Sequence, residues 1–198
     1  YHAFCIEMLE AHGRLLHGRP VRFLYPTEER LRKSEFVGDW NYERKRLAAE
    51  TGLYCFDLLA AGTASLLEGC TALRNRIADR FPMIIIDEFQ DTDNDQWRIV
   101  RALAQVADVF CLADPEQRIF DYRDDIDPRR LDILRETLPV TEFDLGSENH
   151  RSPNAGILGF ADAVLRNQSP LPVTADVNQI SYRLKSFPAT VHAAVVRT

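Results

Sequence analysis

The stretch Met83-Ile84-Ile85-Ile86-Asp87-Glu88-Phe89-Gln90-Asp91-Thr92 is the part of this 198-residue sequence that says most about its architecture. It opens with four consecutive apolar residues, a run too short for a buried helix and rich in β-branched side chains. Such a run is typical of a central strand in a parallel sheet whose two faces are both covered. Two adjacent carboxylates follow directly, and ligands bind at the carboxyl ends of strands in open α/β sheets. We therefore predict a buried parallel strand over 83–86 with a polar site at its end.

Strand-like and helix-like segments alternate after this stretch. Strand patterns recur at residues 109–113 and, by alternation of polar and apolar side chains, at 141–145. Helical spacing of apolar residues predicts helices over 94–106, 128–137 and 153–166. Ser152 and Pro153 suit the start of the last helix, as its cap and first-turn residue. The alternation predicts a doubly wound α/β core with a parallel sheet.

The first 80 residues read as mainly helical. One helix is predicted over 3–16, with Gly18-Arg19-Pro20 as its stop. Exposed, highly charged helices are predicted over 28–50, on either side of a break at Gly38, and two further helical patterns occupy 53–79. The tail from residue 169 shows no clear periodicity.

The composition is that of an ordinary globular protein. Apolar residues make up 45% of the chain, and no apolar run reaches the ~20 residues that a membrane helix needs. This excludes the disordered, fibrous and membrane classes, and we expect no membrane partner. The net charge of −6 argues against a uniformly basic nucleic-acid-binding protein. However, residues 87–148 carry 17 of the 30 acidic side chains but only 7 of the 24 basic ones, so the acidity is local.

The four cysteines favour a reducing compartment. Cys5, Cys55, Cys70 and Cys111 are widely spaced, form no CxxC pair and have apolar neighbours. Buried free thiols are therefore expected, rather than a zinc site or a disulfide framework. The sequence opens without a signal-peptide pattern, and we predict a cytoplasmic protein.

Asp87 and Glu88 are the strongest candidates for chemistry. Of two neighbouring carboxylates at a strand end, one can hold Mg²⁺ while the other orients and deprotonates a water aimed at a phosphate. The alternative is that both acids only cap the following helix. Because Asp91, Asp93 or Asn94 could do that instead, we favour the functional interpretation, a Walker B element.

Two later segments add weaker candidates. Gln117, just beyond the second predicted strand, can reach a terminal phosphate or its attacking water. Phe120 and Tyr122 point the same way in an extended segment, as base-stacking side chains do. The alternative is that both rings belong to the core. Arg151 follows the third predicted strand, but an isolated Arg is usually solvated or salt-bridged.

Taken in order, three strings resemble the signature motifs of one family. Asp87–Thr92, Ala113–Arg123 and Leu145–Ser152 are similar to the second, third and fourth motifs of UvrD/Rep-type superfamily-one DNA helicases. The opening Tyr1-His2-Ala3-Phe4 resembles the TFHxF element that precedes them in that family. The likeness runs from about residue 53 to 166, with the first dozen residues added, and the order of the strings makes it specific.

The resemblance implies roles for individual side chains. It implies Mg²⁺ on Asp87 and Glu88, with Glu88 also acting as the general base of ATP hydrolysis. It makes Gln117 a γ-phosphate sensor that links the nucleotide to DNA, and it puts His150 and Arg151 at the nucleotide. The positions that match DNA-contacting residues of the family are His2, Phe4, Phe120, Tyr122 and Arg123.

The chain also departs from the family pattern. Asp124-Asp125 replaces the usual Gly-Ala after Arg123 and brings negative charge close to the implied DNA path. His150 stands where the family has a Tyr whose ring stacks on adenine. This sequence contains no GxxxxGK(S/T) phosphate-binding loop and none of the later helicase motifs.

The fold implied by the resemblance is a RecA-like parallel sheet core of the P-loop NTPase type with a small helical insertion. Residues 1–19 and 76–166 would belong to the first motor domain and 20–75 to the insertion. Residues 167–198 would be a linker or the beginning of a second motor domain.

The implied function is that of an ATP-dependent DNA helicase fragment. The intact enzyme would use ATP and Mg²⁺ to move 3′ to 5′ on single-stranded DNA, to unwind duplex DNA and to serve DNA repair. The fragment alone is expected to be inactive. The alternatives are a nucleic-acid-binding module that kept the scaffold without hydrolysis and a Mg²⁺-dependent nuclease. The oligomeric state stays open.

Overall fold

The structure is a computed structural model that describes residues 1–120, 122–144, 154–172, 174–177 and 187. The chain forms two compact units, Tyr1–Thr141 and Glu142–Thr198. In the described part of the chain, no helix combines the length and the apolarity needed to cross a lipid bilayer.

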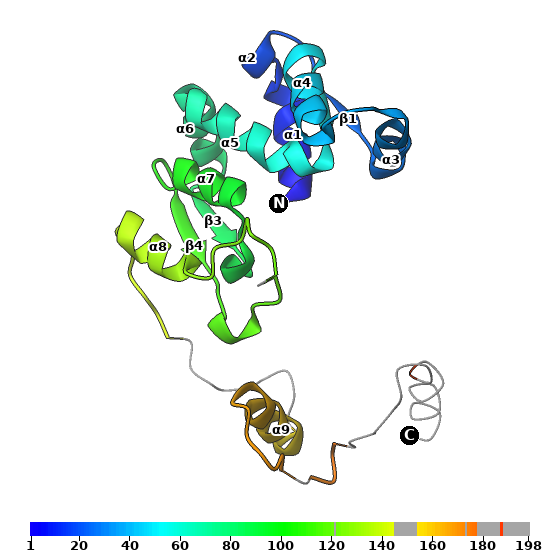
Figure 1. Ribbon diagram of the computed structural model, residues 1–198. Helices are drawn as coiled ribbons and strands as arrows, with labels where there is room; N and C mark the ends of the chain where they lie inside the picture. The colour runs from blue at the N-terminus through cyan, green and yellow to red at the C-terminus, as the bar shows by residue number, and fades with distance from the viewer. Residues whose placement is uncertain (121, 145–153, 173, 178–186, 188–198) are drawn as a thin grey trace. The chain divides into compact units, whose positions relative to one another are not determined.

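A parallel pair of strands lies at the centre of the candidate site. β3 (Met83–Ile86) pairs with β4 (Asp108–Cys111) so that Ile84 lies opposite Val109. The crossover between them consists of the short 3-10 helix η2 (Phe89–Asp91) and α7 (Asn94–Leu103), as Figure 1 shows. The strands predicted over 83–86 and 109–113 are therefore confirmed, the second one shifted by a residue or two.

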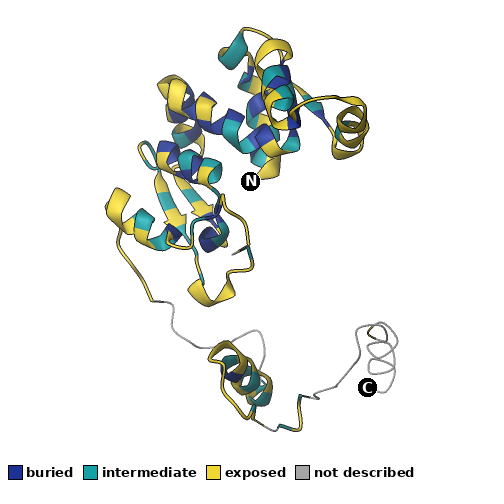
Figure 2. Ribbon diagram, in the orientation of Figure 1, coloured by how far each residue is buried: buried dark blue, intermediate teal, exposed yellow. Residues whose placement is uncertain are grey.

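The prediction that the 83–86 strand is buried on both faces is wrong for the described residues. Ile84 and Ile86 point into a core with Phe89, Trp97 and Val100, but the side chains on the opposite face remain exposed, Met83 and Ile85 by 61% each. The reason is that α7 and α8 (Arg130–Thr137) supply apolar side chains to one face only. Figure 2 shows the exposed positions along both strands.

A larger core joins the N-terminal helices to α7. α1 (His2–His12) and α5 (Leu59–Gly69) pack together, and α5 also packs on α7. Leu9, Leu59 and Ile99 are buried at these contacts. The single helix predicted over 3–16 is broken at Gly13, where a Cβ would overlap Val21, and continues as α2 (Arg14–His17).

A second small sheet was not anticipated from the sequence. β1 (Arg22–Leu24) pairs in parallel with β2 (Leu53–Cys55), and each strand has only three residues. α3 (Pro26–Glu35) and α4 (Trp40–Thr51) lie between them in the sequence and confirm the helices predicted around Gly38. The short 3-10 helix η1 (Phe56–Leu58), α5 and α6 (Thr71–Arg80) follow β2. Strands of three residues are too short to show a two-residue alternation.

The burial predicted for the free thiols is confirmed for two of the four cysteines. All four are free, with Cys5 and Cys55 buried and the other two half-buried. Burial raises the pKa of the Cys55 thiol to about 12 and that of Cys111 to about 11. Both thiols therefore stay protonated near neutral pH.

The second unit contains one described helix, α9 (Ala155–Leu165). Asn154 caps it, since its side-chain oxygen accepts hydrogen bonds from the N–H groups of Gly156 and Ile157. The predicted cap Ser152 and first-turn Pro153 lie outside the described residues. Residues 141–144 form no strand, contrary to prediction, and Phe143 is 69% exposed there. Alternation of polar and apolar residues does not by itself make a strand, because a strand also needs a hydrogen-bonded partner.

Arg130 fastens α8 to the segment that follows η2. It is 2% exposed, and its guanidinium donates from Nε to the Thr92 carbonyl (3.0 Å) and from Nη2 to the Asn94 side chain (2.7 Å). The same group lies over the Trp97 ring. Burial lowers the pKa of Arg130, so the bonds must offset a real desolvation cost.

We predict that Arg130→Met lowers the free energy of unfolding by about 2 kcal/mol, because it leaves the buried Thr92 carbonyl without its donor. Arg129→Met is the matched control: Arg129 is exposed and pairs only at the surface with Glu136, which is worth ~0–1 kcal/mol. Urea denaturation of both variants measures the difference. Equal midpoints would contradict the anchoring role.

Candidate functional site

The carboxyl ends of β3 and β4 meet at one edge, as their parallel pairing requires. Two backbone hydrogen bonds extend the pairing beyond the strands. The Leu112 N–H donates to the Ile86 carbonyl (2.8 Å), and the Phe89 N–H donates to the Leu112 carbonyl (2.9 Å). The segment of Asp87 and Glu88 is thereby held beside the segment that leads to Gln117.

Asp87 and Glu88 are both exposed at this edge. The chain turns sharply there, because Glu88 adopts a left-handed conformation with φ 51° and ψ 45°. The Asp87 carboxylate supports the turn by accepting a hydrogen bond from the Glu88 N–H (3.0 Å). A non-glycine residue pays a conformational cost in this region, and such residues are concentrated at functional sites.

The helix after η2 does not use these two acids as its cap. The N-terminus of α7 is capped by Asp93, whose carboxylate accepts from the Gln96 N–H (2.8 Å). The Gln96 side chain in turn accepts from the Asp93 N–H (3.1 Å), which completes a capping box. The interpretation of Asp87 and Glu88 as caps of this helix is therefore wrong.

Gln90 is a site residue that the sequence analysis missed. It is 1% exposed and lies between the two strand ends. Its Nε2 donates to Glu88 Oε2 (2.7 Å), and its Oε1 accepts from the Asp114 N–H (3.1 Å). Gln117, in the 3-10 helix η3 (Pro115–Gln117), is exposed and donates from its Nε2 to Asp114 Oδ2 (2.6 Å). The sequence did contain a signal for this role, since Gln90 is a polar residue directly after Phe89 in the packed crossover.

Phe120 and Tyr122 contact each other beyond η3. Their ring centroids lie 6.2 Å apart in an edge-to-face arrangement. Phe120 is half-buried, but Tyr122 is 77% exposed. The alternative that both rings belong to the core is therefore wrong for Tyr122, whose face is available to a ligand.

Arg123 is held by an acid that departs from the family pattern. Its guanidinium lies 5.9 Å from the centre of the Phe120 ring and donates from Nε to Asp125 Oδ1 (2.9 Å) and from Nη2 to Oδ2. The pair raises the pKa of Arg123 and lowers that of Asp125. Asp93 Oδ2 lies 4.0 Å from the same guanidinium. Arg123 is thus an exposed side chain whose guanidinium is already paired with a carboxylate.

Of the four remaining predicted residues, the structure describes His2 and Phe4. Phe4 is half-buried against the large core, whereas His2 is exposed beside Phe56, with ring centroids 6.2 Å apart. Tyr25 lies 5.4 Å from the same Phe56 ring, an aromatic neighbour that the sequence analysis also missed. His150 and Arg151 lie outside the described residues.

The acidic pair suits a magnesium ion better than a closed metal cage. Among the described residues, no group of three or more His, Cys, Asp or Glu side chains could hold a metal. Mg²⁺ typically uses one or two protein carboxylates and takes its other ligands from water and substrate phosphates. Two adjacent, exposed carboxylates at a strand end meet that need.

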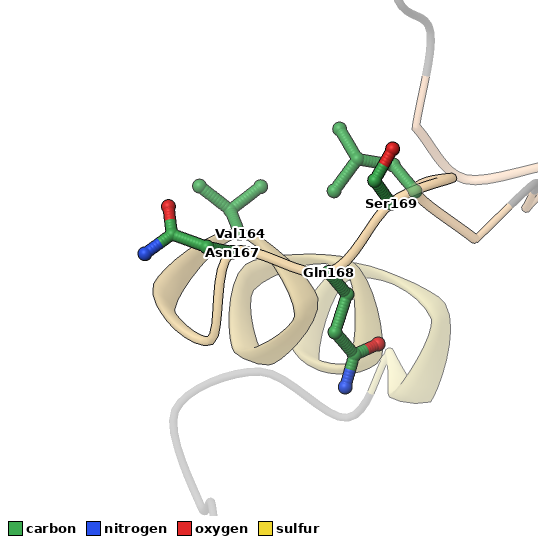
Figure 3. A pocket seen from close by; sticks show the side chains of 5 residues that line it. Val164, Asn167, Gln168 and Ser169 are labelled. Carbon is green, nitrogen blue, oxygen red and sulfur yellow. The ribbon is translucent and has the colours of Figure 1, made fainter.

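Two surface hollows lie away from this edge. One, of about 430 Å³, lies at the end of α9, and Figure 3 shows its lining side chains, Val164, Asn167, Gln168, Ser169 and Leu171. It has no ionisable side chain. The other, of about 450 Å³, is bordered by helices α5 to α8. Arg98 forms a salt bridge with Glu68 there (2.6 Å), and Arg101 lies 4.0 Å from the same carboxylate. Asp87, Glu88 and Gln117 line neither.

A family model covers the strand-end part of the site described above. Residues 40–127 match the model described as UvrD/REP helicase N-terminal domain. The match includes both strand ends, Gln90 and the aromatic pair.

Individual relatives agree with the family model. The chain is 26% identical over 151 residues to the ATP-dependent DNA helicase Rep of Buchnera aphidicola. The aligned region covers 74% of this chain and 23% of that protein. It is 35% identical over 118 residues to the RecBCD enzyme subunit RecB of Mycolicibacterium smegmatis, with 56% and 11% covered. It is 30% identical over 123 residues to DNA helicase II of Haemophilus influenzae, with 60% and 16% covered. The chain spans less than a quarter of each of these relatives.

We predict that Glu88→Gly gives a protein about 1 kcal/mol more stable than Glu88→Ala, because only glycine adopts the left-handed conformation without strain. Both variants lose the carboxylate and its bond to Gln90, so the comparison isolates the backbone. Thermal or urea unfolding measures it. An alanine variant as stable as the glycine variant would show that the turn carries no strain.

Proposed function

We propose that this chain, whose residues 40–127 match the model of the UvrD/REP helicase N-terminal domain, is part of an ATP-dependent DNA helicase. The observation that carries the proposal is the shared edge of β3 and β4. It joins an exposed carboxylate pair to the segment of Gln117, and an aromatic pair with one exposed ring, that of Tyr122, follows on that segment. A helicase needs its two sites close together, because hydrolysis of ATP at one site must be linked to movement of DNA at the other.

On the nucleotide side, Glu88 is the general base that takes a proton from the attacking water. Mg²⁺, bound mainly by Asp87 with Glu88 beside it, would offset the negative charge of the phosphate oxygens. Gln117 senses the terminal phosphate. By the family resemblance, His150 and Arg151 would also serve the nucleotide, since a planar guanidinium suits developing negative charge.

On the DNA side, Tyr122 and Phe120 stack on unpaired bases and Arg123 binds a backbone phosphate. The exposure of Tyr122 supports this assignment. His2 extends the DNA-contacting surface, and its neighbour Phe56, which also contacts Tyr25, adds aromatic area. Phe4 contributes mainly by packing beneath it. Because stacking does not depend on charge, an acidic chain can still grip single strands.

The proposed organisation is that of a partial motor. Residues 1–19 and 76–166 belong to the first RecA-like domain, 20–75 to an insertion and 167–198 to a linker or second domain. The exposed face of β3 and β4 is a surface against which further helices of a RecA-like sheet would pack. The chain by itself is inactive, and the intact protein moves 3′ to 5′, unwinds duplex DNA and serves DNA repair.

The decisive variant is Glu88→Gln in the full-length protein. It keeps the size of the side chain but removes the base, so ATP turnover should fall by roughly 10²-fold or more while nucleotide binding persists. Glu116→Gln is the matched control, since Glu116 is an exposed carboxylate in nearby η3. Phosphate release and equilibrium nucleotide binding measure the two effects. Normal turnover in Glu88→Gln would exclude Glu88 as the base.

A second prediction concerns the acid that holds Arg123. Asp125→Asn should strengthen binding to an oligothymidylate, because it frees the guanidinium for a phosphate. One added phosphate contact steepens the slope of log K against log salt by about 0.7 for single strands. Asp124→Asn removes the same charge one residue away and is the control. Fluorescence anisotropy over a salt series measures both, and identical slopes would contradict the assigned competition.

A further inference from the structure

Gln90 connects the two halves of the proposed site through one side chain. Its amide is buried, with Glu88 at its donor end and the backbone of Asp114 at its acceptor end. We propose that Gln90 is a positioning residue, which fixes the Glu88 carboxylate and couples it to the segment that carries Gln117 and the aromatic pair. This inference rests on the proposed function, because it assigns Glu88 to hydrolysis.

The orientation of the amide is determined by its partners. The Asp114 N–H can only donate, so the atom that faces it must be the acceptor Oε1. Nε2 therefore faces Glu88, where it donates to a carboxylate oxygen at 2.7 Å. A hydrogen bond to an ionised group is stronger than one between neutral groups, and burial strengthens it further.

The Glu88 side chain needs such a support. Its backbone turns through a left-handed conformation, and the carboxylate projects from this turn at an exposed edge. A general base works only when it lies within hydrogen-bond reach of its proton, and a displacement of about 1 Å can cost 10²-fold in rate. The Gln90 amide holds the carboxylate from the buried side and leaves its exposed side open.

The chain of hydrogen bonds that starts at the Gln90 amide continues toward the segment proposed to bind DNA. Asp114 donates its backbone N–H to Gln90 Oε1, while its carboxylate accepts from Gln117 Nε2 (2.6 Å) and from the Glu116 N–H (2.9 Å). A displacement of Glu88 is therefore passed through Gln90 to Asp114 and from there to η3. Phe120 and Tyr122 lie three and five residues beyond Gln117.

The test compares Gln90→Met with Gln96→Met in the full-length protein. The two glutamines suffer the same substitution, and each loses a side-chain oxygen that accepts a backbone N–H. Gln96 belongs to the cap of α7 and has no part in the proposed chemistry. Three quantities are measured: kcat and KM for ATP, the single-strand Kd with and without a non-hydrolysable ATP analogue, and the melting temperature.

We expect Gln90→Met to lower kcat at least tenfold with KM for ATP changed less than twofold. The change in single-strand Kd caused by the ATP analogue should shrink at least threefold. Gln96→Met should lower the melting temperature without either effect. Gln90→Glu keeps the acceptor for Asp114 but replaces the donor to Glu88, so it should also lower kcat even if the methionine variant folds poorly.

The opposite results are equally clear. If Gln90→Met and Gln90→Glu keep the wild-type kcat and the wild-type response to the analogue, Gln90 is only structural and this inference is wrong. The proposed function would stand in that case, because Glu88→Gln would still be inactive. A wild-type protein whose ATP turnover ignores single-stranded DNA would overturn both.

Discussion

The site depends on the parallel pairing of β3 with β4, and above all on its continuation past the strand ends. Leu112 donates to Ile86 and accepts from Phe89, which holds the two outgoing segments side by side. Every later feature follows from this constraint. Gln90 reaches both Glu88 and Asp114 because the strands end at the same edge, and η3 starts beside the carboxylate pair for the same reason. If β3 and β4 were antiparallel, their carboxyl ends, and these side chains with them, would lie at opposite ends of the sheet.

Local charge explains how an acidic chain could bind DNA. The net charge of −6 comes largely from residues 87–148, where the structure gives several carboxylates specific tasks. Asp93 caps α7, Asp114 accepts a hydrogen bond from Gln117, and Asp125 accepts one from Arg123. The last of these contacts opposes DNA binding, since the same guanidinium cannot serve a carboxylate and a phosphate equally well. Asp125 is thus a candidate for weakening the grip on DNA, at a position where the family usually has a small residue.

The sequence predicted the central elements because their signals are strong. Four apolar residues before Asp87 located β3, and helical spacing located α7, α8 and α9 to within a few residues. It did not predict β1 and β2, whose three residues each carry no periodicity. It wrongly predicted a strand beginning at residue 141, because alternation does not reveal whether a hydrogen-bonded partner exists. The motifs identified Asp87, Glu88 and Gln117, but Gln90 went unnoticed, because a connecting role depends on Asp114, 24 residues away.

The most direct measurement is the rate of ATP hydrolysis by the full-length protein with and without single-stranded DNA. If the edge of β3 and β4 links a nucleotide site to a DNA site, an oligothymidylate should raise kcat by at least tenfold. The same rate with and without DNA, in a protein that binds both ligands, would contradict the link. Absence of hydrolysis under both conditions would contradict the motor function itself.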